Sequence, residues 1–190
     1  MQQRKKRPQS RTRKPKRASA QPRLVERALA AFLEAGTIDL SLDKLAASVG
    51  ISKRMLIHYF GDRETLEERA MELLEERLRA QFAPGAFPAG TPASAVVNAL
   101  WERTTSPQSR NVLHLIMDLS RRAWNGSPRA QAFYGEQQRL WVAMLAPIFR
   151  DAQTVEEFLQ LFQGAVLAYL VTGDPKPGRR SLGRFVANST

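Results

Sequence analysis

Residues 52–60, SKRMLIHYF, bring together side chains that can recognise the edges of DNA base pairs. An arginine such as Arg54 can donate two hydrogen bonds to a guanine, and apolar side chains such as Met55 and Ile57 can contact the methyl group of a thymine. If this stretch is the second helix of a DNA-binding helix pair, its residues face the groove together. The residues expected to face the bases are Lys53, Arg54, Met55, Ile57 and His58.

Two short helices joined by a tight turn would hold these side chains in position. Ser41 and Ser52 are each suited to cap a helix, because a serine hydroxyl accepts hydrogen bonds from the unpaired N–H groups of the first turn. Between them, Gly50 permits the left-handed backbone of a turn, and the small Ala46 lets two helices cross closely. Residues 41–60 therefore predict a helix-turn-helix whose second helix enters the major groove of double-stranded DNA. A helical hairpin that binds no nucleic acid is the alternative interpretation.

The N-terminal segment carries most of the positive charge of the chain, whose 190 residues have a net charge of +11. Residues 1–22 contain three prolines, no acidic residue and no large apolar residue after Met1, so we expect them to be disordered. A basic arm of this kind can contact phosphates beside a helix-turn-helix, which adds affinity more than sequence preference. A tail that serves only solubility is the alternative. The basic residues of the expected arm are Arg4, Lys5, Lys6, Arg7, Arg11, Arg13, Lys14, Lys16 and Arg17.

The rest of the chain shows helical periodicity, and no strand pattern of convincing length is found. The stretch RLVERALAAFLEAG predicts a first helix that ends at Gly36, and a long helix is expected to begin after the capping residue Asp62. Residues 83–92, with three prolines and two glycines, predict a loop. The helices expected after that loop span 92–105, 108–124, 128–146, 154–172 and 178–187.

The helix expected at 154–172 is apolar on two sides. Since each apolar side needs a partner, we expect one side to pack in the core of the chain and the other to meet a second copy in a homodimer. Gly164 and Ala168 would allow the close approach. A fully buried central helix is the alternative. The side assigned to the dimer interface consists of Phe158, Leu161, Phe162, Ala165 and Tyr169.

Several classes of protein are disfavoured by what the sequence lacks. It contains no cysteine and two histidines, so disulfides and a zinc or other metal site are not expected. No phosphate-binding glycine loop or nucleophile motif is found, and we expect neither a cofactor nor an enzyme. No apolar run approaches the ~18 residues typical of a membrane span, and the basic N-terminus does not lead into a signal-peptide core. We therefore expect a cytoplasmic protein without membrane association.

Residues 23–74 resemble the N-terminal domain of the TetR family of transcriptional regulators. The resemblance implies an all-α fold, with a three-helix DNA-binding domain at 23–66 and a helical ligand-binding and dimerisation domain at 67–190, after the arm at 1–22. It also implies a sequence-specific regulator that binds a palindromic operator as a repressor and is released by a small-molecule effector. An architectural or nonspecific DNA-binding protein driven by the arm is the alternative. The resemblance depends on the stretch ALAAFLEAG and on Ser41, Leu45, Ala46, Gly50, Ile51, Ser52, Lys53, Leu56, Tyr59, Phe60, Arg63 and Leu66.

The resemblance also implies roles for individual residues. Ser41, Tyr59 and Arg63 would contact phosphates, with Arg63 standing where the family usually has lysine. The family usually shows Gly-Thr-Leu-Tyr-Tyr-His-Phe where this chain has RMLIHYF, so the groove-facing chemistry is its own. The excess of arginine over acidic residues between 84 and 150 favours a neutral or anionic effector. The candidates for lining its pocket, each of which could instead be a core residue, are Trp101, His114, Met117, Trp124, Phe133, Tyr134, Trp141 and Met144.

Overall fold

The computed structural model describes residues 20–149 and 151–189, and this part of the chain contains α-helices, two short 3-10 helices and no strand. The predicted all-α class is confirmed. The nine basic residues of the expected arm lie outside the described residues. The α-helices are α2 (Gln21–Ala35), α3 (Leu42–Val49), α4 (Lys53–Phe60), α5 (Arg63–Ala80), α6 (Ala93–Thr104), α7 (Arg110–Trp124), α8 (Pro128–Leu145), α9 (Ala152–Thr172) and α10 (Lys176–Ser189), and the 3-10 helices are η1 (Pro84–Ala86) and η2 (Pro107–Ser109).

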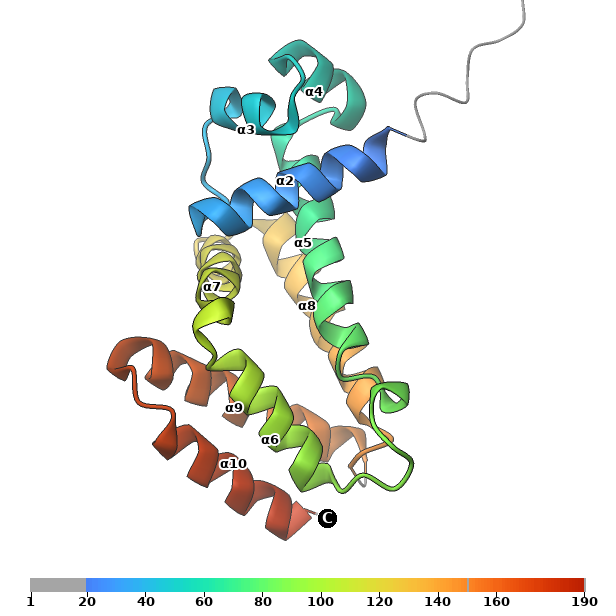
Figure 1. The fold of residues 1–190 in the computed structure, drawn as a ribbon, viewed down its shortest axis with the longest axis vertical. Coiled ribbons are helices and arrows are strands. Elements are labelled where there is room, and N and C mark those ends of the chain that lie inside the picture. Colours follow the sequence, from blue (N-terminus) through green and yellow to red (C-terminus); the bar gives the residue numbers. More distant parts are fainter. Residues whose placement is uncertain (1–19, 150, 190) are drawn as a thin grey trace, which may run out of the picture.

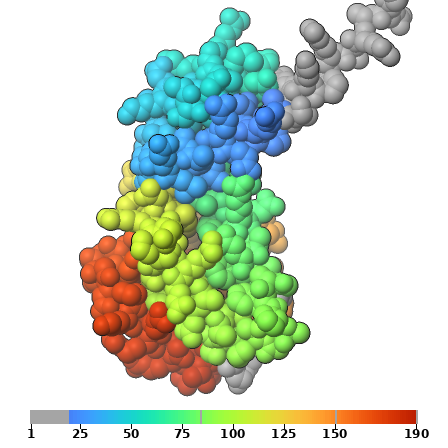
Figure 2. Space-filling model, viewed as in Figure 1, coloured from blue at the N-terminus to red at the C-terminus, as the bar shows by residue number. Residues whose placement is uncertain are grey.

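The molecule is elongated, with α3 and α4 at one end and α9 and α10 at the other (Figure 1). Helices α5, α7 and α8 run between the two ends, and the space-filling view shows the blue and cyan N-terminal helices packed on top of them (Figure 2). Within the described residues, no helix combines the length and the apolar character that crossing a membrane requires.

The helix-turn-helix forms as its capping residues predict. The Ser41 hydroxyl accepts a hydrogen bond from the Lys44 N–H at 3.2 Å, and the Ser52 hydroxyl accepts one from the Met55 N–H at 3.2 Å. Gly50 ends α3 with a φ of 73°, in the left-handed region that favours glycine. These contacts fix the start of α4 at the residue after Ser52.

Helix α5 belongs to both halves of the molecule, the DNA-binding half built from α2 to α5 and the half built from α6 to α10. It begins at its capping residue, where the Asp62 carboxylate accepts the Thr65 N–H at 2.6 Å, and it continues for 18 residues. The domain boundary predicted between residues 66 and 67 therefore lies inside one continuous helix. The core around α2 to α5 also includes Leu115 of α7 and Phe133 of α8, so the two halves share apolar contacts.

A second core is built around Trp101 of α6, which is 1% exposed and donates its indole N–H to the Pro175 carbonyl at 3.0 Å. Phe162 and Tyr169 of α9 pack edge-on against the same indole ring. Phe158, expected at a dimer interface, is instead fully buried inside the chain, because it fills the space between α9 and the other helices of this core. That expectation is therefore corrected for Phe158.

Candidate nucleic-acid interface and ligand cavity

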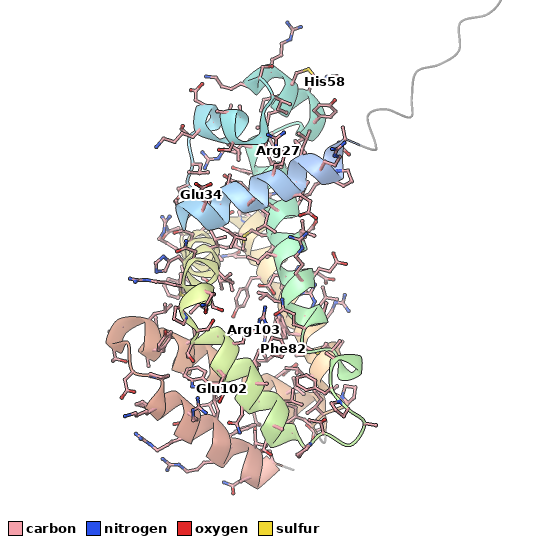
Figure 3. The ribbon with its side chains drawn as sticks, viewed as in Figure 1. Arg27, Glu34, His58, Phe82, Glu102 and Arg103 are labelled. Atoms are coloured by element: carbon pink, nitrogen blue, oxygen red, sulfur yellow. The ribbon has the colours of Figure 1, made fainter. Side chains whose placement is uncertain are left out.

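The outer face of α4 presents the residues that the sequence predicts to face DNA. Leu56 and Phe60 are 0% and 7% exposed and anchor the helix on the core. Met55 and Ile57 lie on the two flanks of this anchored side, and each is 39% exposed. His58 lies at the outer end of the molecule (Figure 3). All five residues expected to face the bases are exposed on α4, with Lys53 and Arg54 at its N-terminal end.

The two cations at the start of α4 are in different environments. The Lys53 ammonium pairs with the Asp43 carboxylate of α3 at 2.8 Å. Arg54 is exposed, and among the described residues it has no ion-pair partner. Arg54 is therefore the cation of this face that is most available for an acceptor on DNA.

The residues expected to contact phosphates differ in how available their side chains are for DNA. Ser41 uses its oxygen to cap α3 and keeps its hydroxyl hydrogen as a donor. Tyr59 is half-buried, and its carbonyl accepts a hydrogen bond from the Gln21 amide at 2.6 Å. Arg63 points elsewhere, since its guanidinium pairs with the Glu67 carboxylate and donates to the Ile38 carbonyl at 3.0 Å. The structure therefore directs Arg63 into the junction between the two halves of the molecule.

Glu67 is the centre of that junction. It is 3% exposed and receives Arg122 of α7, whose Nη1 lies 2.6 Å from Glu67 Oε2. The other arm of the same guanidinium binds Asp39 at 2.6 Å, and this hydrogen bond is the main reason why the pKa of Asp39 lies below its ordinary value. Arg121 also binds Asp39 at 2.6 Å. Helix α7 is thus fastened to the DNA-binding half through paired charges.

Helix α8 makes a second attachment, at the start of α5. Arg129 binds the Glu68 carboxylate with Nε at 2.8 Å, and its Nη2 donates to the Thr65 hydroxyl at 2.8 Å. Asp118 of α7 adds a further contact, because it accepts a hydrogen bond from the Thr37 hydroxyl, between α2 and α3, at 2.6 Å. A movement of α7 or α8 would therefore change the contacts that hold the DNA-binding half in position.

A cavity of about 190 Å³ lies between α5, α6, α7, α8 and α9. Its walls are mostly apolar. Of the residues predicted to line a pocket, four do so: Met117, Phe133, Tyr134 and Trp141.

The other four predicted pocket residues lie outside the cavity wall. Trp101 is buried in the core beneath it, and Met144 packs against that same core. Trp124 is 78% exposed at the end of α7. His114 is half-buried on α7 without reaching the cavity.

Glu75 of α5 lies in the cavity wall, although it was not among the residues predicted to line a pocket. Its Oε2 accepts the Trp141 indole N–H at 2.8 Å and lies 3.7 Å from the Arg79 guanidinium. Burial raises the pKa of Glu75 above its ordinary value, against the smaller opposing effects of Trp141 and Arg79. The available signal was its spacing, because Glu75 follows Met71 by four residues and precedes Leu78 by three, in line with the apolar face.

Residues 24–70 match the protein family described as "Bacterial regulatory proteins, tetR family". This match confirms the predicted resemblance over these residues, which include the helix-turn-helix. No curated protein matches the chain in sequence.

Solved structures share the fold over nearly the whole chain. A transcriptional regulator from Rhodococcus sp. Rha1 has a TM-score of 0.72 at 15% identity, covering 90% of this chain and 95% of that chain. A protein from Saccharomonospora viridis, solved in complex with choline, has a TM-score of 0.70 at 15% identity and covers 90% and 96%. The multidrug binding protein EbrR, complexed with imidazole, has a TM-score of 0.69 at 18% identity and covers 87% and 93%. At such identities these similarities establish the fold.

Proposed function

Because residues 24–70 carry the DNA-binding domain of the TetR family and the chain has the fold of TetR-family regulators, we propose that this protein is a sequence-specific transcriptional regulator, and that it is a repressor released by a small-molecule effector. The observation that carries the proposal is the course of α5. This helix starts three residues after the end of the exposed helix α4 and reaches the cavity at Glu75 and Leu78. One rigid element therefore connects the DNA-facing surface to the cavity.

In this proposal α4 enters the major groove and its exposed face reads base edges. Arg54 supplies paired donors suited to a guanine, and the exposed Met55 and Ile57 supply apolar contacts suited to a thymine methyl. The N-terminal arm adds affinity through phosphates, in a way that weakens as salt increases.

We place the homodimer contact on the outer face of α9. Leu167 is 49% exposed and Val171 is 79% exposed, and the small residues Gly164 and Ala168 lie exposed on the same face. This face differs from the one expected from the sequence, because Phe158 is buried and the other four residues of that set, Leu161, Phe162, Ala165 and Tyr169, pack against the chain's own core. A symmetric dimer would present two copies of α4 to two half-sites, which is why we propose a palindromic operator.

Release by an effector requires that the bound molecule prefer one arrangement of the helices over another. The geometry supports such coupling, because α7 both lines the cavity and carries Arg122, which binds Glu67 and Asp39. Two proteins of similar fold were solved with choline and with imidazole, which favours a small-molecule effector for this chain as well.

Selection of binding sites from random duplexes, followed by a salt titration of the selected duplex against a scrambled one, tests the DNA-binding proposal. We expect a palindrome with half-sites about one helical turn apart, and a preference for it that persists as salt increases. Equal binding to all duplexes, lost when residues 1–22 are deleted, would favour an architectural protein instead. No binding at moderate salt would favour a helical interaction protein.

A further inference from the structure

Most polar side chains in the cavity wall already have partners inside the protein. Each of these groups has at least part of its hydrogen-bonding capacity occupied inside the protein. The hydrogen bonds that occupy them are Trp141 to Glu75 at 2.8 Å, Arg79 to Gln137 at 2.6 Å, Tyr134 to Gln163 at 2.8 Å, Gln163 to Gln138 at 3.2 Å, Ser109 to the Arg103 carbonyl at 2.7 Å and Ser120 to the Ile116 carbonyl at 2.9 Å.

Arg103 and Thr104, adjacent residues of α6, are the exceptions in this wall. Both line the cavity, and neither side chain has a hydrogen-bond or ion-pair partner among the described residues. The neighbouring Glu102 does not neutralise Arg103, because its carboxylate pairs with Arg179 of α10 at 2.9 Å. Figure 3 shows Arg103 beside Phe82, at the space between α6 and α5.

The carboxylate of Glu75 does not balance this positive charge. It is already bonded to the Trp141 indole and lies 3.7 Å from Arg79, which is a cation of its own. Burial also raises the pKa of Glu75, so the neutral form is favoured relative to an exposed glutamate. The charge left uncompensated at the cavity is therefore that of Arg103.

The size of the cavity limits the apolar part of a ligand. An engineered cavity of ~150 Å³ in another protein holds benzene, so the 190 Å³ found here suits a body of about one ring. Phe82, Phe133 and Trp141 supply aromatic surface for such a body.

We propose that the effector cavity selects a small organic monoanion, whose carboxylate is bound by the Arg103 guanidinium and the Thr104 hydroxyl and whose single-ring apolar body lies among the aromatic side chains. The inference rests on the proposed function and adds the chemical class of the effector. Arginine suits this role because its fork of donors matches the two oxygens of a carboxylate.

Isothermal titration calorimetry of the full chain without DNA tests the proposal. The probes are phenylacetate, phenylacetamide and phenethylamine, which have similar shapes and carry a negative, a neutral and a positive group. We expect phenylacetate to bind about tenfold or more tightly than the other two, because hydrogen bonds between charged groups are the strongest of these contacts. Arg103→Gln should remove the preference and Arg103→Lys should keep part of it. Arg180→Gln, an exposed arginine of α10 outside the cavity, should leave it unchanged.

Absence of phenylacetate binding in the millimolar range, equal binding of the three probes, or a preference for the anion that survives in folded Arg103→Gln would each overturn the proposal. A second measurement separates it from the proposed function. If phenylacetate binds through Arg103 but does not change affinity for the selected duplex, the ligand class stands and the effector role fails. If another molecule releases the duplex while phenylacetate does not bind, the ligand class fails and the regulator stands.

Discussion

Replacing Arg122 by methionine should destabilise the junction between the two halves of the molecule. The substitution keeps an apolar stem of similar length and removes the guanidinium that joins Glu67 to Asp39. Glu67 then keeps Arg63 as its partner but loses the bond from α7. The perturbation therefore acts on a buried carboxylate and on an exposed one at the same time.

The magnitude follows from the burial of the two acids. The Glu67 side chain is 5% exposed, and removing one partner of a buried ion pair typically costs about 3–5 kcal/mol. Because Arg63 remains, we expect the lower end of that range. The Asp39 side chain is 46% exposed, so its part adds at most about 1 kcal/mol. We predict a loss of about 3 kcal/mol in the free energy of unfolding for Arg122→Met.

Urea unfolding followed by circular dichroism, at one fixed protein concentration, measures this loss. Arg121→Met is the matched control, because Arg121 is 52% exposed and its partners are exposed or half-buried, so it should cost about 1 kcal/mol or less. Equal losses for Arg121→Met and Arg122→Met would show that the buried pair between Arg122 and Glu67 does not stabilise the junction.

Three further predictions concern packing, pH and assembly. Gly178→Ala should lose about 1–3 kcal/mol of stability in urea unfolding, because the new Cβ would lie 2.3 Å from a Trp101 ring carbon. Gly135→Ala, which has open space around it in α8, should gain about 0.5–1 kcal/mol. The reverse order of stability would contradict this packing. Glu75→Gln should raise the thermal midpoint at neutral pH. The pKa of Glu75 is raised in the folded protein, so the stability that its carboxyl contributes is present below the ordinary pKa of 4.5. That stability is lost as the pH rises through the folded-state pKa. That gain should vanish below pH 4.5 in melting curves, and a gain independent of pH would point to another cause. Leu167→Glu should shift the sedimentation coefficient from dimer to monomer, and an unchanged dimer would exclude this face of α9.

Local signals in the sequence predict the helices well. Ser41, Ser52 and Asp62 cap their helices through bonds to N–H groups three residues away, so the information lies within one turn. The same is true of Gly36 and Gly50, whose left-handed conformations end α2 and α3. These elements could be predicted because their causes are close in the chain.

The junction and the cavity could not be predicted in the same way. Glu67 is buried because Arg122 reaches it from 55 residues away, and Glu75 is buried because Trp141 reaches it from 66 residues away. Helical spacing marked α9 as apolar on two sides, but it could not tell which side faces the chain's own core, and Phe158 was assigned to the wrong one. Such assignments depend on how helices cross, which local patterns do not record.

Fluorescence anisotropy of the selected duplex tests whether α4 reads base pairs through Arg54. We predict that Arg54→Ala loses about 1–3 kcal/mol of affinity for that duplex and relaxes the preference at one position of each half-site. Arg180→Ala, at the opposite end of the molecule, should bind as the parent does. If Arg54→Ala binds the selected duplex with the parent's affinity and the parent's preference at every position, the assignment of α4 as the reading helix is contradicted.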